Sequence, residues 1–147
     1  MRRMDALLEE YGSHHRTRGN LVCHAFGITL ILYGTIALLQ LIPLGHRWTA
    51  AEPVIAISFL YYLSLSAPLA LAMLVETVAL DAIAGAVGSW RVGLAAFVVG
   101  WIFQGIGHAR YEKKSPAFIK NLVHVMIGPV FLWNEVLHIR PAPGGRA

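Results

Sequence analysis

The stretch LVCHAFGITLILYGTIALLQLIPL, from Leu21 to Leu44, contains no residue with a fixed charge. The same holds from Pro53 to Val75, and both runs exceed the roughly 20 residues that a helix needs to cross the hydrocarbon core of a bilayer. Hydrophobic residues make up 56% of the chain and charged residues 14%, whereas soluble domains carry about a quarter charged residues. The sequence therefore predicts an all-α integral membrane protein, a bundle of transmembrane helices forming one domain over residues 1–140.

Pro68 decides how many times the chain is expected to cross the membrane. Proline lacks a backbone N–H and disfavours helix in the residue before it, so we expect the apolar stretch between residues 52 and 90 to break there into two helices. A short amphipathic helix from Met4 to Tyr11, lying on the membrane surface, would precede about five spans, and residues 141–147 would form a disordered tail. The expected spans are about Asn20–Ile42, Val54–Ser66, a helix that contains Glu76 and Asp81 and ends around Gly85 to Trp90, Val92–Gly107, and Pro116–Ile139.

The distribution of charge agrees with this arrangement. With the N-terminus in the cytoplasm, five spans place eight Lys and Arg residues inside and four outside, as the positive-inside tendency requires. A formal charge of +4 scattered between apolar spans suits lipid headgroups, and no motif indicates nucleic acid as a partner. The polar first 20 residues are no cleavable signal peptide, so we expect a multi-pass protein of a bacterial inner membrane or the endoplasmic reticulum. The single cysteine, Cys23, excludes a disulfide or a cysteine-based metal site within one chain.

Histidines gather at the predicted cytoplasmic ends of the spans. His15 and His24 lie where the first span begins, and His108 lies where the fourth span ends. His108 and Glu112 are four residues apart, so both side chains share a face if the helix continues. Neutral imidazoles with a carboxylate and open positions form the ligand set of non-haem Fe(II) oxygenases, and the same set suits zinc. We therefore expect a metal site formed by these four residues, with His124 as a reserve ligand.

Other polar residues have two readings each. Asn20 and Asn121 open apolar runs, where an asparagine either caps a helix or orients a ligand through a hydrogen bond. Glu76, Asp81 and Glu135 lie in or close to the bilayer region, where an ionisable group is costly and indicates function, although a structural salt bridge would also account for it.

The basic residues after the fourth span also have two readings. Arg110 and Lys113 either contact solvent and lipid or hold a substrate carboxylate.

The glycines of the fourth span suit close contact between helices better than phosphate binding. These glycines are Gly100, Gly105 and Gly107.

Three other histidines are expected to have structural roles and not to bind metal. They are His14, His46 and His138.

These residues form a familiar pattern. The segment WIFQGIGHARYEKKSPA, from Trp101 to Ala117, resembles the signature of the small membrane family typified by the yeast 2-hydroxy fatty acid dioxygenase of phytosphingosine breakdown. The resemblance departs at Tyr111, where phenylalanine is usual, and at Thr29, where proline is common. Further matching residues are Tyr11, His15, Asn20, His24 and Gly27 near the N-terminus, and Asn121, Pro129, Phe131 and Glu135 near the C-terminus.

The resemblance implies a function for the predicted site. It implies Fe(II)-dependent α-oxidation, in which a 2-hydroxy fatty acid loses one carbon and dioxygen is the co-substrate. The substrate would bind iron through its hydroxyl and carboxylate oxygens while its acyl tail extends between helices into the bilayer. The residues that we expect to serve catalysis are Asn20, Glu112 and Asn121, and those that we expect to bind substrate are Arg110, Tyr111 and Lys113.

Two other classes of function stay open on the sequence. One is a non-catalytic scaffold or small transporter, in which the polar residues support folding or a permeation path. The other is a zinc-dependent lipid hydrolase, which metal analysis and oxygen dependence would separate from a dioxygenase. A homo-oligomer is compatible with each of them.

Overall fold

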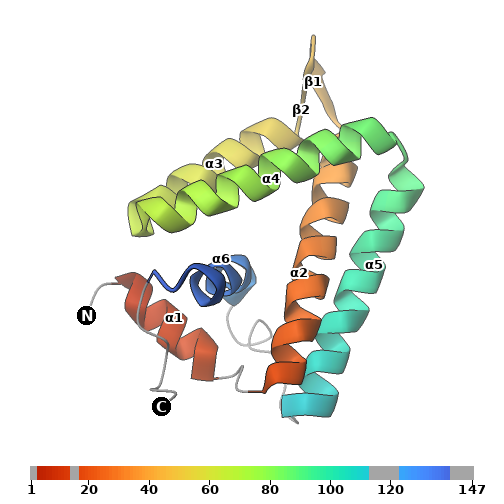
Figure 1. Ribbon diagram of the computed structural model, residues 1–147. Coiled ribbons are helices and arrows are strands. Elements are labelled where there is room, and N and C mark those ends of the chain that lie inside the picture. The colour runs from red at the N-terminus through yellow and green to blue at the C-terminus, as the bar shows by residue number, and fades with distance from the viewer. Residues whose placement is uncertain (1–2, 14–16, 113–122, 140–147) are drawn as a thin grey trace.

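The computed structural model describes residues 3–13, 17–112 and 123–139, and it confirms an all-α architecture (Figure 1). A short β-hairpin interrupts the helices where the sequence indicated only a loop. The elements in chain order are α1 (Arg3–Ser13), α2 (Arg18–Leu39), β1 (Pro43–Gly45), β2 (Trp48–Thr49), α3 (Ala51–Leu65), α4 (Ala67–Val87), α5 (Trp90–Ile106), the π-helical turn η1 (Gly107–Glu112) and α6 (Val123–Leu137).

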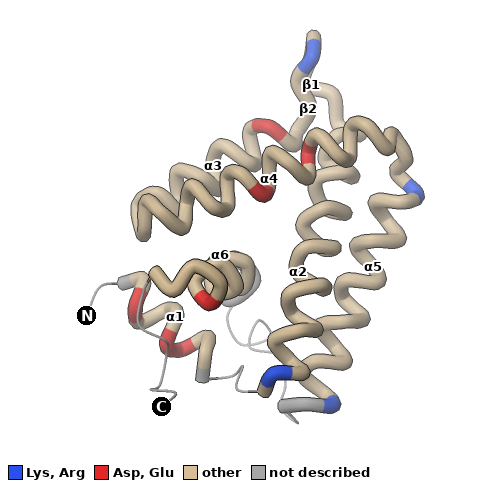
Figure 2. Tube along the Cα trace, in the orientation of Figure 1, with Lys and Arg blue, Asp and Glu red and all other residues tan. Residues whose placement is uncertain are grey.

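Three helical stretches in the described part are long and apolar enough to cross a membrane. They are Arg18–Leu39, Ala67–Val87 and Trp90–Arg110, whereas α3 and the apolar part of α6 are shorter. Figure 2 shows that charged residues are absent from the middle of α2 and α5 and lie near the ends of these two helices. The five crossings and the cytoplasmic N-terminus stay predictions, and residues 116–122 and 141–147 lie outside the described residues.

Helices α2 and α5 run antiparallel and form the most extensive helix pair of the molecule (Figure 1). Their contact follows glycines spaced seven residues apart, Gly27 and Gly34 on α2 and Gly93 and Gly100 on α5. A Cβ at Gly34 would lie 2.5 Å from the carbonyl oxygen of Gly93, and one at Gly27 would lie 2.9 Å from that of Gly100. Backbone therefore packs directly on backbone, as small residues permit between helices in membranes. A strict seven-residue repeat is typical of left-handed helix pairs.

The prediction that glycines permit close helix contact holds for two of the three positions named. Gly100 and Gly107 both face α2 at distances that leave no room for a side chain. The prediction is wrong for Gly105 within the described part of the chain, because a Cβ there would meet no atom of the described residues within 4 Å.

The break predicted at Pro68 is confirmed. Ser66 is extended (φ −163°, ψ 111°) and separates α3 from α4, and the proline occupies the first turn of α4, where its missing N–H costs nothing. Figure 1 shows α3 and α4 side by side, crossing the upper end of α2 at a steep angle. The side chain of Gln40, at the end of α2, donates hydrogen bonds to the backbone oxygen and Oδ1 of Asp81 at 2.9 and 2.8 Å. This contact ties α2 to α4.

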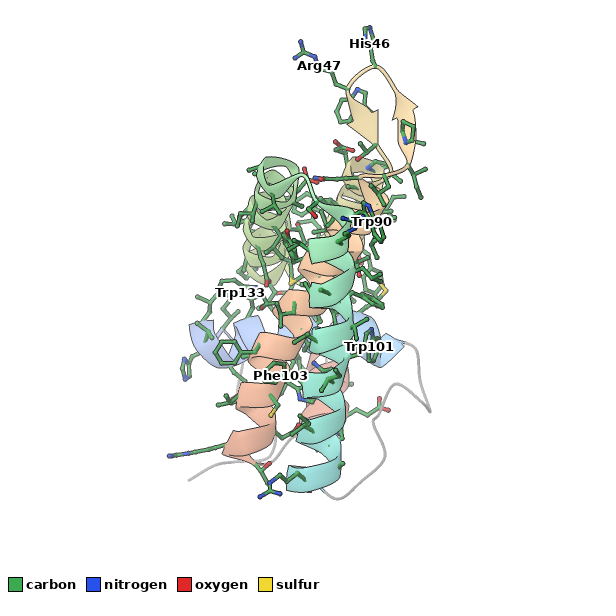
Figure 3. The ribbon with its side chains drawn as sticks, turned by 90° about the vertical axis from the view of Figure 1, so that its right-hand side faces the viewer. His46, Arg47, Trp90, Trp101, Phe103 and Trp133 are labelled. Carbon is green, nitrogen blue, oxygen red and sulfur yellow. The ribbon has the colours of Figure 1, made fainter. Side chains whose placement is uncertain are left out.

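The β-hairpin projects beyond the end of α2, and His46 and Arg47 lie at its tip (Figure 3). Its tight turn uses positive φ at Gly45 (100°) and His46 (51°). At its base, the backbone N–H and Oγ1 of Thr49 donate hydrogen bonds to Glu52 Oε2 at 2.8 and 2.7 Å. Partial burial alone would raise the pKa of the Glu52 carboxyl, but these hydrogen bonds hold the pKa below its ordinary value.

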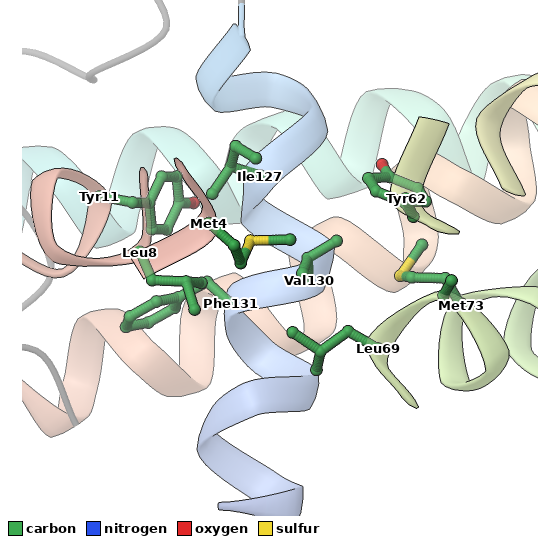
Figure 4. Close-up of a cluster of buried hydrophobic side chains, with 10 residues drawn as sticks. Met4, Leu8, Tyr11, Tyr62, Leu69, Met73, Ile127, Val130 and Phe131 are labelled. Atoms are coloured by element: carbon green, nitrogen blue, oxygen red, sulfur yellow. The ribbon is translucent and has the colours of Figure 1, made fainter. Parts of the chain in front are cut away.

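Helix α1 is amphipathic, as its sequence predicts, but protein rather than lipid covers its apolar face. Met4, Leu8 and Tyr11 are buried against α6, and the rings of Tyr11 and Phe131 lie 5.1 Å apart between centroids. Burial raises the pKa of the Tyr11 phenol, so the side chain stays protonated. Figure 4 shows this cluster extending from α1 across α6 to α3 and α4. Its buried members are Met4, Leu8, Tyr11, Tyr62, Leu69, Ala70, Met73, Ile127, Val130 and Phe131.

Candidate metal centre

Four buried polar side chains gather where the start of α2 meets the end of α5. Asn20 and His24 on α2 are 0% and 2% exposed, and Gln104 and His108 on the α5 side are 7% and 4% exposed. Polar groups buried in a bundle this apolar are costly, which indicates a functional site. The sequence had predicted that the two histidines meet, but it gave Gln104 no role.

Asn20 does not cap α2. The N-cap is Thr17, whose hydroxyl accepts a hydrogen bond from the backbone N–H of Asn20 at 3.3 Å. Asn20 therefore lies within the first helical turn, and its side chain is turned into the interface with α5. The prediction that Asn20 is an N-cap is wrong, because α2 begins two residues earlier than expected. Asn121, which was also expected either to cap a helix or to orient a ligand, lies outside the described residues.

The imidazoles of His24 and His108 lie edge to face, with ring centroids 4.8 Å apart and an interplanar angle of 83°. His24 Nδ1 is 3.0 Å from the backbone oxygen of Asn20. When Nδ1 carries the proton and donates to this oxygen, the lone pair of the ring is on Nε2. A histidine held in this way is typical of metal ligands.

The separation of the two rings is compatible with a shared metal ion. Two imidazoles that bind one ion through a nitrogen at about 2.1 Å hold their centroids roughly 4.5 to 5.2 Å apart, for nitrogen–metal–nitrogen angles of about 90° to 109°. The observed 4.8 Å lies within this range. Among the described side chains, no group of three His, Cys, Asp or Glu is close enough to hold an ion. The described part of the site thus offers two such ligands, and a further His, Asp or Glu ligand would have to come from outside it.

Gly107 explains how the end of α5 comes so close to α2. A Cβ at this position would overlap Asn20 Oδ1 and lie 3.1 Å from the Cβ of Cys23 and 3.3 Å from Nδ1 of His24. Gly107 continues the seven-residue spacing of the glycines on α5, and Asn20 takes the corresponding position on α2. The glycine repeat therefore leads directly into the site.

The helix continues past Gly107, which was the condition for His108 and Glu112 to share a face, but it continues as a π-helix from Gly107 to Glu112. π-Helical turns occur mostly as single turns and frequently at functional sites. His108 is buried in this turn, whereas Arg110 is exposed. Hydrogen bonds in a π-helix join residues five apart. The α-helical argument that His108 and Glu112, four residues apart, share one face therefore does not apply directly here.

The remaining residues of the predicted site are not described. They stay predictions, both as metal ligands and as catalytic or substrate-binding residues. His15, Lys113 and Asn121 lie outside the described residues, and the side chains of Tyr111, Glu112 and His124 lie outside the described part.

A second polar cluster lies away from the imidazoles. Glu76 Oε2 accepts a hydrogen bond from Trp133 Nε1 at 2.6 Å, and Thr29 Oγ1 lies 3.5 Å from Glu76 Oε1. The cluster joins α4 to α6 and α2. These contacts, with the one between Gln40 and Asp81, give Glu76 and Asp81, two of the three predicted intramembrane carboxylates, a hydrogen-bonded role in joining helices.

Comparison with known proteins places the chain in a family. A family model described as 2-hydroxy-palmitic acid dioxygenase Mpo1-like matches residues 1–139. The chain is 28% identical over 133 residues to a protein of Saccharomyces cerevisiae named 2-hydroxy-palmitic acid dioxygenase MPO1, and the match covers 86% of this chain and 75% of the yeast protein. No solved structure matches the chain.

Proposed function

Because the chain belongs to the Mpo1-like family, described as 2-hydroxy-palmitic acid dioxygenase, we propose that it is a membrane dioxygenase that converts a 2-hydroxy fatty acid into the acid one carbon shorter. The proposal includes Fe(II) as the metal and dioxygen as the co-substrate. The observation that carries it is the pair of buried imidazoles, His24 and His108, at one end of an apolar helix pair.

His24 and His108 would be two of the metal ligands, and His15, Glu112 and His124 are the sources from which the others would come. Bound Fe(II) would supply open coordination positions and activate dioxygen. The four electrons that reduce dioxygen would come from the 2-hydroxy acid, whose carboxyl carbon leaves as CO2. The backbone oxygen of residue 20 holds the His24 ring in place before any ion arrives, so little reorientation is needed on binding.

The residues around the imidazoles would bind the substrate and limit access of water. The exposed Arg110, with Tyr111 and Lys113, would attract the carboxylate of a fatty acid at this end of the helices. The acyl tail would extend from there along the apolar helices, where contact with water is lost. Direct backbone packing of α2 on α5 closes one side of the site against water.

Metal analysis of the purified protein, combined with oxygen uptake in the presence of 2-hydroxypalmitate, tests this proposal. We expect stoichiometric iron, and uptake that requires both iron and the 2-hydroxyl group and yields the acid one carbon shorter. His24→Ala and His108→Ala should each lose iron and oxygen uptake. His46→Ala is the matched control, because this histidine lies at the hairpin tip (Figure 3) and should leave both unchanged.

Two results would overturn the proposal. The first is stoichiometric zinc with turnover of a lipid ester or amide in the absence of oxygen, which would make the protein a hydrolase. The second is oxygen uptake that survives when both His24 and His108 are replaced by alanine in a folded protein.

A further inference from the structure

Gln104 is a buried amide beside the two imidazoles to which the proposed function gives no role. Its side chain is 7% exposed, and its Nε2 has no hydrogen-bond partner among the residues that the structure describes. Buried polar atoms in proteins almost always have a partner, and one without a partner calls for an explanation. A missing ligand is one such explanation.

The position of Gln104 is set by the close contact of the two helices. A Cβ at Gly27 would lie 2.9 Å from Gln104 Nε2, so the amide lies against bare backbone of α2. Gly27 is three residues after His24, and Gln104 is four residues before His108. At about 1.5 Å of rise per residue, the amide thus lies roughly 4.5 to 6 Å further along the helix pair than the imidazoles, toward the middle of both helices.

A 2-hydroxy fatty acid bound at the imidazoles has one orientation that suits its environment. Its carboxylate lies at the end of the helices and its tail toward their apolar middle, because burial of the tail is favourable and burial of an unpaired carboxylate is not. The carbon that carries the hydroxyl follows the carboxyl carbon on the tail side. Gln104 lies on this same side of the imidazoles.

Building on the proposed function, we propose that Gln104 recognises the 2-hydroxyl group and thereby distinguishes 2-hydroxy fatty acids from fatty acids that lack it. Nε2 donates a hydrogen bond to the hydroxyl oxygen. An acid without the hydroxyl leaves this donor buried and unpaired, which is how a site built to bind a hydroxyl rejects the analogue that lacks one. Gln104 is thus a specificity-determining residue, separate from the metal ligands.

Binding measured without turnover tests this assignment. Wild-type protein and Gln104→Leu, both carrying their metal, are titrated under nitrogen with 2-hydroxypalmitate and with palmitate, and quenching of tryptophan fluorescence reports binding. The variant should bind 2-hydroxypalmitate about tenfold more weakly and palmitate no more weakly, so that the preference falls about tenfold. Gln40→Leu, at the other glutamine of the chain, is the matched control and should keep the wild-type preference.

The outcomes separate this assignment from the proposed function. If wild-type protein binds the two acids equally, the proposed function and the role of Gln104 both fail. If wild-type protein shows the preference and Gln104→Leu keeps it, or weakens both acids alike, only the role of Gln104 is overturned. Should Gln104→Leu fail to fold, Gln104→Asn withdraws the amide by one methylene, and an unchanged preference in that variant overturns the assignment as well.

Discussion

Replacing Gly100 with alanine would disturb the helix contact on which the metal site depends. The added methyl group would lie 2.7 Å from the carbonyl oxygen of Gly27 and 2.9 Å from the backbone nitrogen of Ile31. Neither atom is the end of a flexible side chain, so the backbone itself must move. Since ordinary van der Waals contact begins at 3.4 Å, α2 and α5 would have to separate by about 0.7 Å.

The expected loss of stability follows from two opposing effects. Overpacking of a tight contact costs about 1 to 3 kcal/mol. Alanine gains about 1 kcal/mol over glycine inside a helix, which offsets part of that cost. The net loss is about 0 to 2 kcal/mol, which lowers the melting temperature of a chain of this length by at most roughly 6 °C.

Thermal unfolding in detergent, followed by circular dichroism at 222 nm, measures this effect. Gly105→Ala is the matched control on the same helix, because a Cβ there meets none of the described atoms within 4 Å, so the gain in helix propensity is the expected effect. The control should raise the melting temperature by roughly 2 to 4 °C. If Gly100→Ala stabilised the protein as much as Gly105→Ala, the reasoning from backbone contact would be refuted.

Three further predictions use the same unfolding assay or a metal analysis. Trp133→Phe leaves an oxygen of Glu76 without its donor and should cost about 1 to 2 kcal/mol, whereas Trp90→Phe, at a half-exposed indole, should cost much less. The lowered pKa of Glu52 contributes stability that is present above its unfolded pKa of about 4.3 and is lost as the pH falls through the folded pKa. Glu52→Gln should therefore destabilise the protein at pH 7 and have no effect at strongly acid pH. Equal destabilisation at both pH values would contradict this prediction. Gly107→Ala should reduce the iron content of the protein, because the methyl group of the alanine would overlap Asn20 on α2, beside His24. Full iron occupancy in this variant would count against a metal site at this helix contact.

Local stereochemistry made some features predictable from sequence. The break before Pro68 follows from the missing N–H of proline, and it occurs at Ser66, where it was expected. The apolar runs predicted the helices by their length, and the meeting of His24 with His108 followed from the antiparallel course of spans that begin and end at one face. Each of these inferences needs only the residue itself or the direction of the chain.

The packing of the helices was not predictable in the same way, because lipid and protein interior are equally apolar. Phe26 is 61% exposed and Ile28 is 9% exposed, yet both are large apolar residues on α2. Hydrophobic periodicity therefore does not tell which face of such a helix meets another helix. For this reason the steep crossing of α3 and α4 and the docking of α1 on α6 were missed, and the burial of Gln104 was not foreseen. The glycine spacing is present in the sequence and would have predicted the pairing of α2 with α5.

The seven-residue spacing also restricts how α2 and α5 can slide along one another. A shift of a few residues would bring side chains against the backbone that glycine now leaves open. Glycine would meet glycine again only after seven residues, which is about 10 Å of travel. That distance would separate His24 from His108 altogether, so the two imidazoles cannot drift gradually out of alignment while the helices stay packed.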